Sequence, residues 1–168
     1  MREIRIAKVT LNFGAGKDQA LLNKGVELLK LITGIPPIKT VTQKRLAAWG
    51  LRPGLPIGCK ITLRGPPAHE MLTRLVQARE NILDTPCFDD FGNVSFGIKE
   101  YIDIPGVKYD PKLGILGLQV SVTLERPGFR IKRRKIKKTR ISRKHQITRE
   151  NAIDYFKKHY KITVGDAE

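Results

Sequence analysis

The stretch IGCKITLR, residues 57 to 64, alternates apolar and polar side chains along its length. Its apolar positions are Ile57, Cys59, Ile61 and Leu63, and glycine, lysine, threonine and arginine stand between and after them. Because successive side chains of a strand point to opposite faces of a sheet, this alternation predicts a strand with one buried and one polar face. Cys59 falls on the buried side and is expected in the core.

Three other stretches repeat the alternation, at residues 9–13, 93–98 and 118–124. Their apolar positions are Val9, Leu11, Phe13, Val94, Phe96, Ile98, Leu118, Val120, Val122 and Leu124. A shorter strand is expected over residues 38–43. The opposite face of these strands would then carry asparagine, threonine, serine, lysine and arginine side chains.

Two helices are expected between the strands, from apolar residues at helical spacing. Asp18 can cap the first helix, and Gly34 with the prolines after it ends that helix. A proline pair starting at Pro66 opens the second, whose buried side is expected to run from Met71 to Ile82. If both helices cover apolar strand faces, the result is a two-layer α+β fold: a largely antiparallel sheet, helices on one face and an open polar face. Such a face either binds RNA or is an ordinary solvated surface.

Positive charge is concentrated near the C-terminus of this chain of formal net charge +16. Ten of the sixteen positions from 130 to 145 are Lys or Arg, and none is Asp or Glu. The ten are Arg130, Lys132, Arg133, Arg134, Lys135, Lys137, Lys138, Arg140, Arg143 and Lys144. Such a run predicts a polyanionic partner and is expected to be ordered only when phosphates or acidic surfaces neutralise it. A solvated tail that aids solubility is the alternative.

The 168 residues are long enough for one compact domain with an appendage. We expect a single domain over 1–168, with an α+β core over about 1–126 and a basic C-terminal extension over 127–168. Thr148 can cap a terminal helix whose apolar stripe includes Ala152 and Phe156. This helix would anchor the far end of the extension and hold the basic run as a tethered arm.

Patterns for catalysis, metal binding or membrane insertion are weak. No stretch approaches the ~18 to 20 apolar residues of a membrane span, and the N-terminus lacks a signal peptide's apolar run, so a cytoplasmic protein without membrane contact is expected. Cys59 and Cys87 lack the spacing of a disulfide framework or zinc site. Gly14-Ala15-Gly16-Lys17 fails as a phosphate loop, because Asp18 stands where Ser or Thr is required. We therefore expect no metal, no cofactor and no enzymatic activity, and interpret Asp89-Asp90 as a turn.

Five motifs follow one another along nearly the whole chain: residues 9–16, 44–56, 57–65, 91–100 and 115–118. Together they resemble the family of large-subunit ribosomal protein five, a 5S ribosomal RNA-binding family. The short N-terminus and the basic tail are similar to its archaeal and eukaryotic branch, of which the archaeal form fits best.

The resemblance implies a structural constituent of the large ribosomal subunit, in the cytoplasm, without enzymatic activity. It implies binding to 5S ribosomal RNA, a part in forming the central protuberance, and contact with P-site transfer RNA. Large-subunit ribosomal RNA and neighbouring ribosomal proteins are the further partners expected. The basic arm would contact ribosomal RNA.

Particular residues carry these implied roles. Asn12 and Thr62 match family positions that contact 5S RNA, and the expected neighbours on the same face are Lys60, Arg64, Asn93 and Ser95. The loop implied to reach P-site transfer RNA contributes Lys44, Arg45, Trp49, Gly50 and Arg52. Trp49 either stacks on the RNA or pins the loop, and we expect pinning. Ile35 stands where the family commonly has Gln, so a contact made by that Gln is in question.

Two other functions compete with this interpretation. A general polyanion-binding protein would act on DNA or RNA through the basic arm alone, with no preference among nucleic acids. A nuclease or RNA-modifying enzyme would need an acid, base or metal cluster, for which the sequence offers no recognisable spacing.

Overall fold

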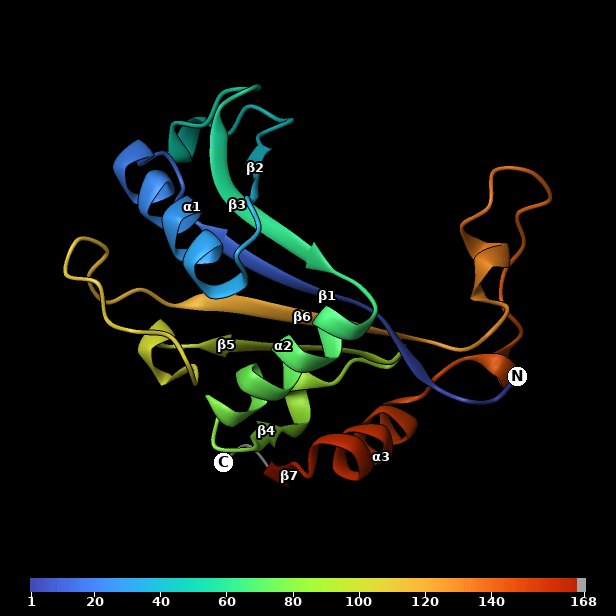
Figure 1. Cartoon of the computed structure of the whole chain (residues 1–168). Helices are drawn as coiled ribbons and strands as arrows, with labels where there is room; N and C mark the ends of the chain where they lie inside the picture. The colour runs from blue at the N-terminus through green and yellow to red at the C-terminus, as the bar shows by residue number, and fades with distance from the viewer. Residues whose placement is uncertain (166–168) are drawn as a thin grey trace.

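The computed structural model describes residues 1–165, and a five-stranded antiparallel sheet lies at its centre (Figure 1). The strand order is β2-β3-β1-β6-β5. These strands are β1 (Arg5–Gly14), β2 (Ile38–Val41), β3 (Pro56–Leu63), β5 (Asn93–Ile98) and β6 (Leu118–Glu125). The four predicted alternating stretches therefore all form strands, and the predicted α+β class is confirmed.

Apolar residues of all four long strands meet on one face of this sheet. Val9, Leu11, Cys59, Val94 and Val120 are each completely buried there. Burial raises the pKa of the Cys59 thiol to about 11, so the side chain is a neutral core residue at physiological pH, as predicted.

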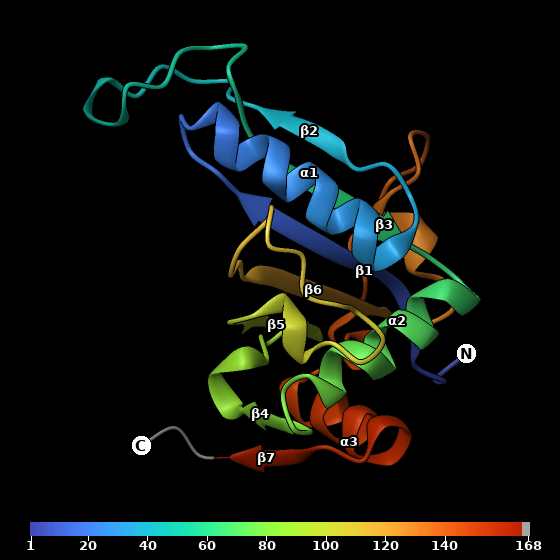
Figure 2. The ribbon, with the colours of Figure 1, turned by 60° about the vertical axis from the view of Figure 1, so that its left-hand side comes forward.

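Helices α1 (Gln19–Thr33) and α2 (Pro66–Gln77) cover this apolar face (Figure 2). Asp18 caps α1 by accepting hydrogen bonds from the amides of Ala20 and Leu21, and Gly34 ends the helix in the left-handed conformation. Gly25 lets α1 approach β1 closely, because a Cβ at this position would collide with the Phe13 ring. The two layers are thus in direct contact, as expected.

The predicted buried side of α2 is correct through Val76 but wrong at Ile82. The helix ends at Gln77, and Ile82 lies in β4 (Ile82–Asp84) with 45% of its surface exposed. Strand β4 pairs in parallel with β7 (Thr163–Gly165), which brings the C-terminal part of the chain back to the body of the protein.

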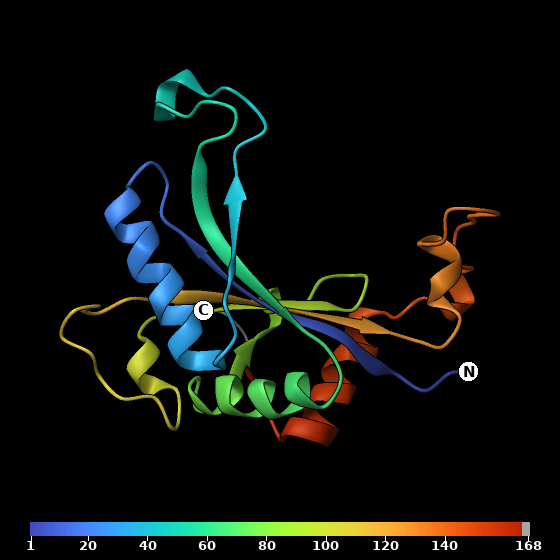
Figure 3. The same cartoon turned by 45° about the horizontal axis from the view of Figure 1, so that its top comes forward.

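Helix α3 (Arg149–Tyr160) packs into the same hydrophobic core as the sheet (Figure 3). Thr148 caps it through the amide of Asn151, as predicted, and the Phe156 ring meets the Phe88 ring edge to face with centroids 5.9 Å apart. The far end of the basic segment is therefore anchored. A division of the chain near residue 126 stays a prediction, since core residues lie on both sides of that position.

Candidate nucleic-acid interface

The sheet face opposite the helices is lined by polar side chains in register across four strands. We call it the open face, and it consists of Lys8, Thr10, Asn12, Lys60, Thr62, Asn93, Ser95, Gln119, Ser121 and Thr123. Each of these residues is exposed or half-buried, whereas their strand neighbours are largely buried. The open polar face expected from the alternation is present.

The structure brings Asn12, Lys60 and Thr62 together on the adjacent strands β1 and β3 of this face. Asn12 lies opposite Lys60, and Thr62 lies opposite Thr10 on the neighbouring strand. The Asn12 side-chain nitrogen donates a hydrogen bond to the Gln119 side-chain oxygen at 3.0 Å. This bond orients the Asn12 amide, and the Asn12 side-chain oxygen faces away from Gln119.

The other expected face residues occupy its margins. Ser95 donates a hydrogen bond to the Ser121 hydroxyl at 3.2 Å, and Arg64 is exposed one residue beyond the end of β3. Asn93 is already engaged, because its side-chain nitrogen donates to the Asp89 carboxylate at 2.6 Å. The sequence-based set omitted Gln119, although the alternation in residues 118–124 places it on the polar side.

Residues 42–55, which we call the long loop, protrude beyond the sheet at the end of β1 where Gly14 lies (Figure 2). Lys44, Arg45 and Arg52 are all exposed. The Trp49 side chain is 69% exposed, so the expectation that it pins the loop is wrong. The buried apolar residue of the loop is Leu51, which is only 6% exposed and whose backbone forms a bridge with that of Leu46. Gly50 directly follows the short helix η1 (Ala47–Trp49) and precedes Leu51.

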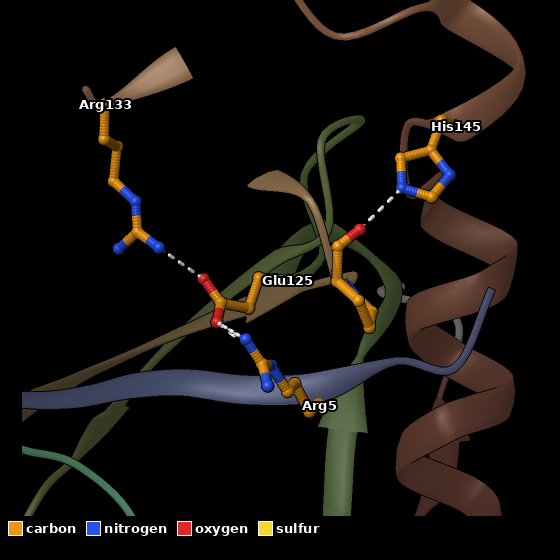
Figure 4. Close-up of polar contacts among 5 residues, drawn as sticks. Arg5, Glu125, Arg133 and His145 are labelled. Atoms are coloured by element: carbon orange, nitrogen blue, oxygen red, sulfur yellow. Dashed lines mark hydrogen bonds and ion pairs between the residues drawn. The ribbon is translucent and has the colours of Figure 1, made fainter. Parts of the chain in front are cut away.

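Residues 127–147 form the basic arm, which projects near the opposite end of β1 from the long loop (Figure 1). Its base is folded against the core, with Phe129 only 4% exposed. Arg126 donates a hydrogen bond to the Gln146 carbonyl at 3.1 Å, and a His145 ring nitrogen lies 3.0 Å from the Pro127 carbonyl (Figure 4). The basic segment was expected to be ordered only with a neutralising partner. That expectation is wrong at the base of the arm, because the burial of Phe129 and these two contacts hold the base against the core.

Glu125 joins the arm to the sheet (Figure 4). Its carboxylate accepts hydrogen bonds from Arg5 at 2.8 Å and from Arg133 at 2.7 Å. Arg133 is therefore already ion-paired, while Lys135, Lys137 and Lys138 are exposed and form no ion pair within residues 1–165. The tip of the arm thus offers unneutralised charge to a polyanion.

We expect Glu125→Gln to lower the free energy of unfolding by about 1 kcal/mol, because two guanidinium groups lose one shared carboxylate that is 12% exposed. Urea denaturation measures this loss. Asp90→Asn is the matched control, since the Asp90 and Arg149 side chains are 77% and 45% exposed and the pair contributes little. Equal stability of the two variants would mean that Glu125 does not fasten the arm.

Asp89 and Asp90 form a turn, as interpreted from the sequence. Asp89 accepts hydrogen bonds from the backbone amides of Phe91 at 2.8 Å and Asn93 at 2.7 Å. Partial burial alone would raise the pKa of the Asp89 carboxyl, but the hydrogen bonds from Asn93 and Phe91 outweigh it and hold that pKa below its ordinary value.

Metal-binding and membrane-spanning features are both absent from residues 1–165. No group of three or more His, Cys, Asp or Glu side chains is arranged to hold a metal ion in this part of the chain. Within the same residues, every helix is too short or too polar to cross a bilayer.

The fold and these surfaces define an α+β protein with an uncovered polar sheet face and a projecting basic arm. Residues 1–52 match the family described as Ribosomal protein L5, and residues 56–155 match the C-terminal part of the same ribosomal family. The chain belongs to this family of ribosomal proteins. It is accordingly a structural, non-enzymatic component of the large subunit of the cytoplasmic ribosome, as the resemblance implied.

Individual relatives align with almost the whole chain. Large ribosomal subunit protein uL5 of Nanoarchaeum equitans is 46% identical over 165 residues, which are 98% of this chain and 97% of that protein. The protein of the same description from Sulfurisphaera tokodaii is 42% identical over 165 residues, 98% of this chain and 93% of its own length. That from Nitrosopumilus maritimus is 44% identical, with 98% and 95% covered. These matches support the predicted archaeal character.

Proposed function

We propose that the chain binds 5S ribosomal RNA through the open face and helps to fix that RNA in the central protuberance. The observation that carries the proposal is the convergence of Asn12, Lys60 and Thr62 on adjacent strands of the open face. Their amide, ammonium and hydroxyl groups suit phosphate oxygens and ribose 2′-hydroxyls. Contacts of this kind recognise the shape of a folded RNA rather than its base sequence.

A broad sheet suits this role because some of its side chains are oriented before the RNA arrives. Asn12 and Ser95 each have a hydrogen-bonded neighbour on the next strand. Little side-chain freedom is then lost on binding, and the lost freedom would otherwise weaken the complex.

The proposal is tested by salt-titrated binding of the purified protein to 5S ribosomal RNA, with transfer RNA and duplex DNA of equal length as competitors. A preference for 5S RNA over both competitors is the expected result. Equal affinity for all three nucleic acids would favour the alternative, a general polyanion-binding protein.

The long loop supplies the proposed contact with P-site transfer RNA. Lys44, Arg45 and Arg52 are exposed on a segment that projects away from the sheet, and the exposed Trp49 ring is free to stack on RNA. We expect ribosomes carrying Lys44→Gln, Arg45→Gln and Arg52→Gln together to bind P-site transfer RNA about tenfold more weakly, since phosphate contacts are lost. Filter binding measures this affinity.

The same three substitutions should leave 5S RNA binding by the isolated protein unchanged, because the loop and the open face are separate surfaces. If the affinity for P-site transfer RNA were unaltered, the long loop would not contact that RNA.

The basic arm is proposed to contact ribosomal RNA, either 5S RNA or the larger RNA of the subunit. Its position beside the open face, at the end of β1 where Arg5 lies, supports a single continuous RNA-facing side. Neighbouring ribosomal proteins are the remaining proposed partners.

A further inference from the structure

A cavity of about 420 Å³ lies where the basic arm passes the turn before β5. Its floor is apolar, formed by Phe129 and Ile147, which are 4% and 1% exposed. No open-face residue and no long-loop residue belongs to its lining. In Figure 1 the turn that precedes β5 reaches towards the base of the arm. The cavity is therefore separate from the open face and the long loop, and it belongs mainly to the basic arm.

Phe91 forms one wall of this cavity and is 67% exposed. Its position is fixed by the turn, because the Phe91 amide donates to the Asp89 carboxylate at 2.8 Å. Gly92 has a φ of 77°, and a Cβ there would lie 2.6 Å from Ile147 Cγ2, so the turn sits directly on the cavity floor. The backbone that carries the ring is thus held in place, and the ring itself is exposed.

The remaining wall is cationic. Lys132, Arg140 and Arg143 line the cavity, and no Asp or Glu does. The Lys132 ammonium lies 4.9 Å from the centroid of the Phe129 ring, so a positive charge is held over the apolar floor. The Gln146 side-chain nitrogen donates to the Ile141 carbonyl at 3.4 Å, which leaves the Gln146 side-chain oxygen to accept a hydrogen bond from the edge of a base.

We propose that this cavity binds one unstacked nucleotide of an RNA, with its base against Phe91 and its phosphate on Lys132, Arg140 and Arg143. The proposal rests on the basic arm contacting RNA but not on which RNA that is. An aromatic wall beside three cations suits a nucleotide, which joins a flat ring to an anion. The volume lies within the range of about 300–1,000 Å³ that is usual for pockets holding small ligands.

A peptide side chain suits this cavity less well. An apolar side chain would leave the three cations without partners, and an arginine or lysine would be repelled by them. An acidic side chain would meet the cations but not the exposed ring. The nucleotide is the ligand that uses both features at once.

The test compares two RNA hairpins that differ only by one bulged adenosine in the stem. We expect the full-length protein to bind the bulged hairpin about tenfold more tightly than the paired one, because one extra base stacks on the protein. Phe91→Ala should abolish this preference and leave the affinity for the paired hairpin unchanged. Phe91→Trp should retain it, since indole also stacks.

Tyr109→Ala is the matched control, because Tyr109 is an exposed aromatic residue (53%) that does not line the cavity. A preference that survives Phe91→Ala, or equal binding of both hairpins by the unaltered protein, overturns the proposal that the cavity binds a nucleotide. Either result leaves the RNA-binding role of the arm intact. Absence of salt-dependent binding to either hairpin would overturn the RNA-binding role of the arm as well.

Discussion

Replacing Asn12 and Thr62 together by Ala is expected to weaken binding to 5S ribosomal RNA by about 2–3 kcal/mol, roughly 30- to 150-fold. Asn12 presents an amide oriented by Gln119, and Thr62 presents a hydroxyl two positions along β3 from Lys60. If both groups bond to the RNA in a closed interface, removing them leaves RNA groups buried without partners, which costs more than the bonds alone. Fluorescence anisotropy with labelled 5S RNA measures the change.

The matched control removes the same two residue types from the helix layer. Asn23 of α1 and Thr73 of α2 are both exposed on the opposite side of the protein, so Asn23→Ala with Thr73→Ala should leave the affinity unaltered. Circular dichroism checks that both variants fold. If the open-face variant bound as tightly as this control, the 5S interface would have to lie elsewhere on the protein.

Replacing Lys135, Lys137 and Lys138 by Gln is expected to reduce RNA affinity about 50- to 150-fold at 0.15 M salt. The reason is that each phosphate contact releases condensed counterions from the RNA, and these three ammonium groups have no intramolecular ion pair within residues 1–165. The slope of log K against log salt should also fall in magnitude by about 2 to 3.

A control for net charge is available in the same chain. Lys24, Lys30 and Lys112 are exposed away from the arm, and changing them to Gln lowers the formal charge of +16 by the same amount. We expect this second triple variant to keep nearly the whole salt slope. If both variants lost slope equally, the arm would act only through the overall charge of the protein.

The layers of this fold could be predicted from the sequence because strand alternation is a local signal. Val94 and Phe96 alternate with Asn93 and Ser95, and the structure places the first pair in the core and the second on the open face. Both helix caps, Asp18 and Thr148, were also recognisable, since capping depends on neighbouring residues only.

Two of the predictions that proved wrong concerned which side chains are buried. Trp49 was expected to pin the long loop, but it is 69% exposed and the smaller Leu51 is the buried residue of the loop. Order at the base of the arm comes from Phe129 entering a core built mainly by other segments. The ion pair between Glu125 and Arg5 spans 120 positions and leaves no local sequence pattern.

Truncation is an unsuitable test of the arm, because the segment after residue 126 contributes to the core. Truncation after residue 126 would remove Phe129, Ile147 and Phe156 from the hydrophobic core, so loss of binding could reflect unfolding. Neutralising the exposed lysines of the arm removes the charge and keeps these core residues in place.

The most direct test of the central claim is therefore the ratio of affinities for 5S ribosomal RNA and transfer RNA, measured with the Lys135→Gln, Lys137→Gln, Lys138→Gln variant. Recognition by the open face predicts that this ratio stays close to that of the unaltered protein, while both affinities fall together. A ratio that drops to one would contradict the account, because selectivity would then reside in the charge of the arm.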